Sequence, residues 1–161
     1  MEPNVSAKQQ QPDQHADEVA TARDTLLLEL LLDVGSELSG AQLYLVRGKE
    51  LRGHLACDDD GIDDQGVRHR RLPLSLLSVA CRTVDQGIPY FGPVPQTDPC
   101  AALVDEETLA EHGLALLPLR LGERTVALLV GHPRRALDRE LRDVLCVLTH
   151  EAASGLGKLI A

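Results

Sequence analysis

The stretch that most restricts the fold is LALLPLRLGERTVALLVG, residues 114–131, which consists of two apolar runs around a short polar break. Gly122 and Glu123 suit the two central positions of a tight hairpin turn, with the glycine first. In both arms apolar residues occupy odd and even positions alike, so each strand is apolar on both of its faces. Such a hairpin must be covered on both sides, which predicts the buried centre of a sheet without chemistry of its own. Pro118 has no N–H to donate, so irregular pairing is expected there.

Length and composition predict one soluble domain with an aliphatic core. At 161 residues the chain can bury a full core, and aromatic residues make up only 2% of it, so leucine must fill that core. Few aromatic faces are available to stack on nucleobases or flavins. The net charge of -9 arises in residues 1–64, and the run RHRR at 68–71 is expected to balance the acidic loop at 58–64. The sequence therefore predicts neither nucleic acid nor an anionic membrane as a partner.

The cysteines and the acidic loop are interpreted as structural rather than as metal or redox sites. Four cysteines are scattered without a Cys-x-x-Cys pair, and three lie in apolar surroundings, as is usual in a reducing cytoplasm. The acidic run DDDGIDD at 58–64 lacks the spacing of a calcium-binding loop. Neither an apolar leader nor a membrane-spanning run is visible, so we expect a cytoplasmic protein. We expect neither a cofactor nor a metal.

The domain organisation predicted is a polar, disordered tail over residues 1–15 and a single domain over 16–161. A helix is expected from about Asp17 to Leu32 or Val34, and its stretch 26–32 is apolar almost all the way round. The final helix, capped by Asp138, repeats leucines at spacings of three and four. A second subunit is the economical cover for these surplus leucines. The expected dimer face comprises Leu26, Leu27, Leu30, Leu31, Leu141, Leu145, Leu148 and Leu156.

Between the terminal helices the sequence predicts mostly strands. Two strands are expected at 41–46 and 50–57, and a third, shorter one at 67–72. A helix capped by Ser75 follows and ends at Gly87, with Leu76 and Leu77 on its buried face. A short strand at 88–92 then leads into a long connection, 93–112, that contains a short helix at 105–111.

This order of elements resembles that of GAF domains. The resemblance is best over LPLSLLSVACRTVDQGIPYFGPV (72–94) and over residues 114–131, and it covers roughly residues 20–161. It implies an α+β, GAF/PAS-like (profilin-like) fold, in which a central antiparallel sheet carries the N- and C-terminal helices on one face. Another profilin-like sandwich, such as a Roadblock-type domain, is the competing architecture, and the long connection before the hairpin favours GAF.

The resemblance implies a non-catalytic regulatory or sensory module of a bacterial type, dimeric through its terminal helices, that acts on a separate signalling partner. By fold analogy, a small-molecule pocket on the other face of the sheet is expected to involve His69, Arg71, Cys81 and Tyr90. The alternative is a ligand-free interaction scaffold on the same fold. A third possibility is a redox enzyme, because free methionine sulfoxide reductases with a GAF fold carry a run similar to GHLACD (53–58). Here that run ends the second strand instead of following the middle helix, so we attribute the match to chance.

Overall fold

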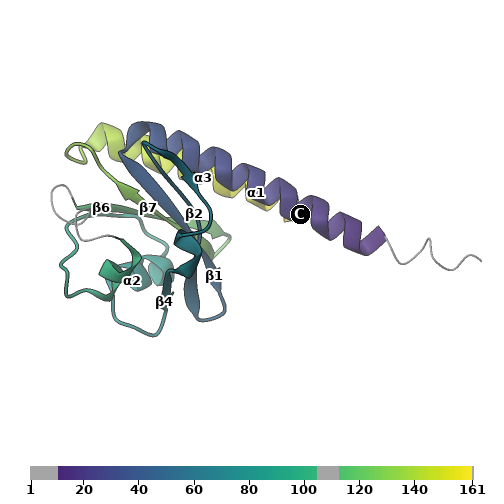
Figure 1. Cartoon of the computed structure of the whole chain (residues 1–161), viewed down its shortest axis with the longest axis horizontal. Coiled ribbons are helices and arrows are strands. Elements are labelled where there is room, and N and C mark those ends of the chain that lie inside the picture. Colours follow the sequence, from purple (N-terminus) through teal and green to yellow (C-terminus); the bar gives the residue numbers. More distant parts are fainter. Residues whose placement is uncertain (1–10, 105–112, 161) are drawn as a thin grey trace, which may run out of the picture.

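The computed structural model describes residues 11–104 and 113–160 and shows one sheet between two helical layers (Figure 1). The helices are α1 (Gln11–Glu37), α2 (Val79–Gln86) and α3 (Arg139–Ile160), with short 3-10 helices η1 (Val67–His69) and η2 (Pro99–Leu103). The strands are β1 (Gly40–Arg47), β2 (Glu50–Asp58), β3 (Gly61–Asp63), β4 (Arg71–Pro73), β5 (Tyr90–Gly92), β6 (Leu114–Leu121) and β7 (Arg124–His132). The expected helix at 105–111 lies outside the described residues.

The sheet has the strand order β3-β2-β1-β7-β6-β5, and β4 pairs with β2 beside β3. Its pairings are antiparallel. The long helices α1 and α3 pack together on one face, and α2 covers the other (Figure 1). This arrangement confirms the predicted α+β fold with both terminal helices on one side of a central antiparallel sheet.

The β6–β7 hairpin occupies the centre of the sheet and is buried on both faces, as its sequence predicts. Leu129 packs in the cluster on the α1/α3 side, and its neighbour Leu128 packs in the cluster on the α2 side. Gly122, with a φ of 63°, sits in the two-residue turn between the paired ends of the strands. Pairing stays regular at Pro118, and the register shift comes between Leu119 and Arg120. The irregular pairing expected at Pro118 is therefore not observed there, and the irregularity lies further along β6.

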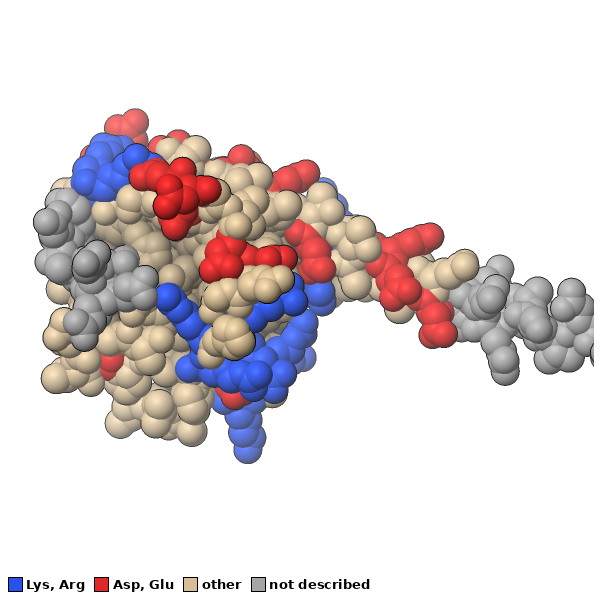
Figure 2. All heavy atoms as spheres, in the orientation of Figure 1, with Lys and Arg blue, Asp and Glu red and all other residues tan. Residues whose placement is uncertain are grey.

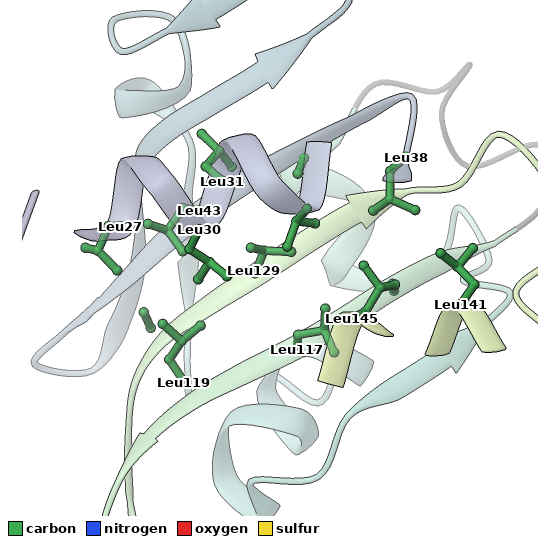
Figure 3. Packing of buried hydrophobic residues seen from close by; sticks show 14 of the residues in the cluster. Leu27, Leu30, Leu31, Leu38, Leu43, Leu117, Leu119, Leu129, Leu141 and Leu145 are labelled. Atoms are coloured by element: carbon green, nitrogen blue, oxygen red, sulfur yellow. The ribbon is translucent and has the colours of Figure 1, made fainter. Parts of the chain in front are cut away.

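The cluster between the helices and the sheet explains most of the surplus leucines (Figure 3). Six of the eight leucines assigned to a dimer face are buried in this cluster within one chain: Leu27, Leu30, Leu31, Leu141, Leu145 and Leu156. That assignment is wrong for these six, because α1 must cover the sheet on one side and contact α3 on the other. Leu26 and Leu148 are only partly buried, at the seam between α1 and α3.

Helix α1 starts earlier than expected and extends past the sheet. It begins at Gln11 rather than near Asp17, so residues 11–15 are helical, and the remainder of the expected tail lies outside the described residues. Its 27 residues correspond to about 40 Å, whereas strands of eight or nine residues span about 30 Å. The N-terminal turns of α1 therefore project beyond the body of the domain (Figure 1).

The ends of α2 differ in part from the prediction. The N-cap is Ser78, whose hydroxyl accepts from the Cys81 N–H, and not Ser75. Leu76 and Leu77 consequently lie before the helix, 42% and 93% exposed, and the expectation that they line its buried face is wrong. Gly87 ends the helix in the left-handed conformation, as predicted. Asp138 caps α3 as expected, since its carboxylate accepts from the Leu141 N–H.

Candidate functional site

The four residues expected to share a pocket are spread across the α2 side of the sheet. His69, in η1, is exposed; Arg71, in β4, is exposed and contacts Glu50. Cys81 is buried on α2, and its thiol donates to the Pro73 carbonyl over 3.4 Å. Tyr90 lies in β5, and its hydroxyl donates to the Pro93 carbonyl over 2.6 Å. Because β4 pairs with the outer edge of β2, it lies five strand positions from β5, and about 24 Å separates the two ends of this set.

Aliphatic side chains fill the space between those ends. Leu51, Leu72, Leu103, Leu114, Leu116 and Leu128 are among the fully buried members of the cluster under α2. Both faces of the central strands are therefore covered by packed side chains. The structure does not bring the four predicted residues together, and their role in ligand binding stays a prediction.

A buried polar cluster at the centre of this face was missed by the sequence reasoning. The Tyr44 hydroxyl donates to the Leu103 carbonyl over 2.5 Å, and Arg70 Nη1 donates to the same oxygen over 2.7 Å. The side-chain amide of Gln42 contacts the Tyr44 hydroxyl. These hydrogen bonds connect η2 and the segment after η1 to β1. They also satisfy polar groups that would be costly to leave unpaired in the protein interior. Gln42 was the available signal, because it is the polar residue within the apolar run 41–46.

The cysteines are held as protonated thiols. Burial raises the pKa of the Cys57, Cys81 and Cys146 thiols above the usual value, and it raises the pKa of Cys100 to about 12. A thiolate is the reactive form, so none of these environments activates a nucleophile. GHLACD ends β2, the position that its sequence context predicts. Within the described residues, no group of three or more potential ligands is placed to hold a metal ion.

His54, the histidine of that run, serves the packing of α1 on β2. Its Nε2 lies 3.4 Å from the Asp24 carboxylate, and the side chain is 14% exposed. Burial lowers its pKa below the ordinary value of 6.5, although Asp24 acts in the opposite direction. The neutral form is therefore favoured near neutral pH, and the Asp24 contact holds it as a hydrogen-bond partner.

An apolar groove lies where α1 passes the edge of the body, between α1, the end of α3 and the strands. Its volume is about 420 Å³, within the range of ligand-sized sites. We call it the helix groove; its lining residues are Ala16, Val19, Ala20, Arg23, Leu27, Leu45, Arg47, Leu121, Val126, Ala127, Leu156, Leu159 and Ile160. The lining is aliphatic apart from two arginines. Sequence reasoning missed this groove, because a helical pattern does not show where a helix leaves its sheet.

The outer seam of the helical layer is also partly apolar. A second depression of about 230 Å³ runs between α1 and α3, and Leu26 and Leu148 lie in it beside Glu29, Asp33 and Glu151. Further along α3, Val144 and Val147 are 37% and 55% exposed. The helical layer therefore carries apolar surface both in the helix groove and along α3. Among the described residues, no helix has the length and hydropathy required to cross a bilayer.

Comparisons with known proteins identify the fold. Neither a scan against protein-family models nor a search of curated proteins gave a match. Among solved structures, the GAF-B domain of DevS from Mycobacterium smegmatis is 17% identical, with a TM-score of 0.61 over 86% of this chain and 92% of that one. The GAF domain of a phosphoenolpyruvate-protein phosphotransferase from Coxiella burnetii is 16% identical, with a TM-score of 0.60 over 91% and 90% of the two chains.

The same fold also carries an enzyme. A type II free methionine-R-sulfoxide reductase from Thermoplasma acidophilum is 9% identical, with a TM-score of 0.58 over 86% of this chain and 96% of that one. At these identities the likeness shows the fold, which is that of GAF domains, and the fold hosts more than one function.

Proposed function

We propose that the chain is a non-catalytic regulatory module that forms a homodimer through its helical layer and acts on a separate signalling protein. The GAF-like fold supports a regulatory module, since GAF domains of DevS and of a phosphotransferase share it. The raised thiol pKa values favour this proposal over the reductase alternative. Four free cysteines, two of them buried and two partly exposed, suit a cytoplasmic location.

One observation carries the dimer proposal: α1 projects beyond its own sheet, above an open apolar groove. Short helical segments without tertiary contacts are only marginally stable in water. Val19 and Ala20, which lie near the projecting end, turn toward aliphatic residues of the helix groove without filling it. A second copy of α1 covers the projecting turns of the first copy, and it places aliphatic side chains against the aliphatic lining of the helix groove. Leu26, Leu148, Val144 and Val147 extend the same layer.

A ligand-free scaffold is the second candidate, and the aliphatic packing under α2 favours it. In that case the signal passes through protein contacts alone. Native mass spectrometry of the protein purified from its own host separates the two candidates. A small molecule retained on the dimer supports a sensor, whereas a dimer that carries only another polypeptide supports the scaffold.

Val19→Glu is expected to weaken self-association at least about 100-fold, because a charged carboxylate replaces an aliphatic contact and has to lose its hydration in the interface, even beside Arg23. Sedimentation equilibrium measures the dissociation constant. The matched control is Thr25→Glu, which adds the same charge to the same helix at an exposed position outside the groove. It should leave the dimer intact, and circular dichroism should show both variants folded. Equal dissociation constants for the two folded variants, or a wild-type protein that stays monomeric, would contradict the proposal.

A further inference from the structure

The fold gathers positive side chains at one corner of an acidic protein. Arg47 ends β1, Lys49 lies in the β1–β2 turn, Arg52 lies in β2, Arg68 lies in η1, and Arg71 lies in β4. All five are exposed, and we call them the basic corner. Figure 2 shows the blue surface that Lys and Arg side chains form over the β1 and β4 region. The chain as a whole has a net charge of -9, so this concentration of cations runs against the overall composition.

The pairing of β2 with β4 places two of these cations opposite each other. Arg52 and Arg71 are partners in the register, and like charges at such positions destabilise a sheet. Glu50 contacts both guanidinium groups, and its Oε1 lies 3.3 Å from Arg71 Nη1. The side chains of Arg52 and Arg71 nevertheless stay 49% and 56% exposed. One carboxylate therefore bridges two arginines that keep free donors, and the corner retains an excess of positive charge.

The surroundings of the corner favour a short carboxylate-rich segment over a nucleic-acid backbone. Four of the five cations are arginines, whose planar groups bind carboxylates through two parallel hydrogen bonds. Phosphate can be bound in the same way, but a long polyanion placed on this corner also approaches acidic surface. Asp58, Asp59 and Asp60 are exposed at the far end of β2, and Asp13 and Asp17 are exposed on α1. A short acidic segment fits the corner without meeting that repulsion.

We propose that the basic corner is the surface on which an acidic segment of the partner protein docks. This inference rests on the proposed function, because it names the chemistry of the signalling partner. The corner lies outside the seam between α1 and α3, and Arg47 is its one residue that also lines the helix groove. Docking and self-association can therefore be separated by experiment.

The probe is a short, dye-labelled polyglutamate peptide, and fluorescence anisotropy measures its binding to the full chain at low and at physiological ionic strength. The double variant Arg52→Gln/Arg71→Gln should bind about tenfold more weakly, and added salt should weaken binding to the wild type. The control Arg135→Gln/Arg139→Gln removes the same charge from exposed positions just before and at the start of α3 and should bind like the wild type.

Equal loss of affinity in both double variants would overturn the proposal, because binding would then follow net charge rather than the corner. Tighter binding of a single-stranded oligonucleotide with the same charge as the peptide would also overturn it, in favour of nucleic acid. Sedimentation equilibrium on the same samples keeps the two proposals apart. If Arg52→Gln/Arg71→Gln remains dimeric but binds the peptide more weakly, both the dimer proposal and the docking proposal are supported. If the wild type binds the peptide as a monomer, only the dimer proposal is contradicted.

Discussion

Leu128→Ala and Leu129→Ala should each lower the free energy of unfolding by about 2–5 kcal/mol. Both side chains are fully buried, and these two neighbours belong to different core clusters on opposite faces of the sheet. Each truncation removes apolar contacts and leaves a cavity that a packed sheet cannot close. Urea denaturation measures both losses. An unchanged slope of the free energy of unfolding against urea concentration would show that the variants unfold in the same reaction as the wild type.

The exposed residue Leu77 provides the control for this pair. Leu77→Ala should change stability by no more than about 0.5 kcal/mol, since the side chain is 93% exposed. If one of the two strand variants also lost less than about 1 kcal/mol, one face of the hairpin would be open. That result would contradict a sheet covered on both sides.

Gly53→Ala should lower the free energy of unfolding by about 3 kcal/mol or more. A Cβ atom at this position would lie 1.8 Å from the Val67 carbonyl oxygen, which is part of the backbone of η1. The Gly53 N–H also donates to the Arg70 carbonyl over 2.9 Å. The new methyl group therefore has to push η1 away from β2, and the bond that holds this crossing is strained or lost. Chemical denaturation measures the effect.

Gly157→Ala is the matched control within α3. Its Cβ would meet only Leu121 Cδ2, at an ordinary contact distance of 3.9 Å. Alanine is the better helix former, so this variant should gain up to about 1 kcal/mol. If Gly53→Ala were as stable as the wild type, η1 would not lie against β2 as described, and the position of Arg68 in the basic corner would be in doubt.

The sequence was most informative where a pattern has a single structural solution. Two apolar faces around Gly122 require a central hairpin, and the structure has one. Asp138 begins α3 and Gly87 ends α2 as their chemistry demands. The cap of α2 was misassigned because Ser75 and Ser78 are equally good caps by type, and only the contact of Ser78 with Cys81 separates them.

The leucines of α1 show the limit of pattern reasoning. Leu27, Leu30 and Leu31 are all buried within one chain, because α1 faces both the sheet and α3. Hydrophobic periodicity gives the apolar arc of a helix but not which neighbour covers it. From the arc alone we predicted that a second subunit covers these three leucines, but the sheet and α3 of the same chain cover them.

The candidate surfaces depend on the strand register, which the sequence does not supply. Arg52 and Arg71 are 19 residues apart and meet only through the pairing of β2 with β4. The residues that line the helix groove likewise come from α1 and α3 and from the strands β1, β6 and β7. The run at 68–71 was expected to balance the acidic loop, and Arg70 does interact electrostatically with Asp63 of that loop. Arg71, however, contacts Glu50, and Asp59 of the loop contacts Arg134. Charge along the chain does not show which charges become neighbours.

The central claim is that the projecting part of α1 is covered by a second copy of the chain. Amide hydrogen exchange over residues 13–27, measured at increasing protein concentration, tests it most directly. Exchange in this segment should slow as the dimer forms, because dimer formation suppresses local opening of the helix. Amides of β3, at the edge of the sheet beside β2, serve as the internal reference and should not change. Exchange over residues 13–27 that is independent of concentration, in a protein that does associate, would place the interface elsewhere and contradict the account.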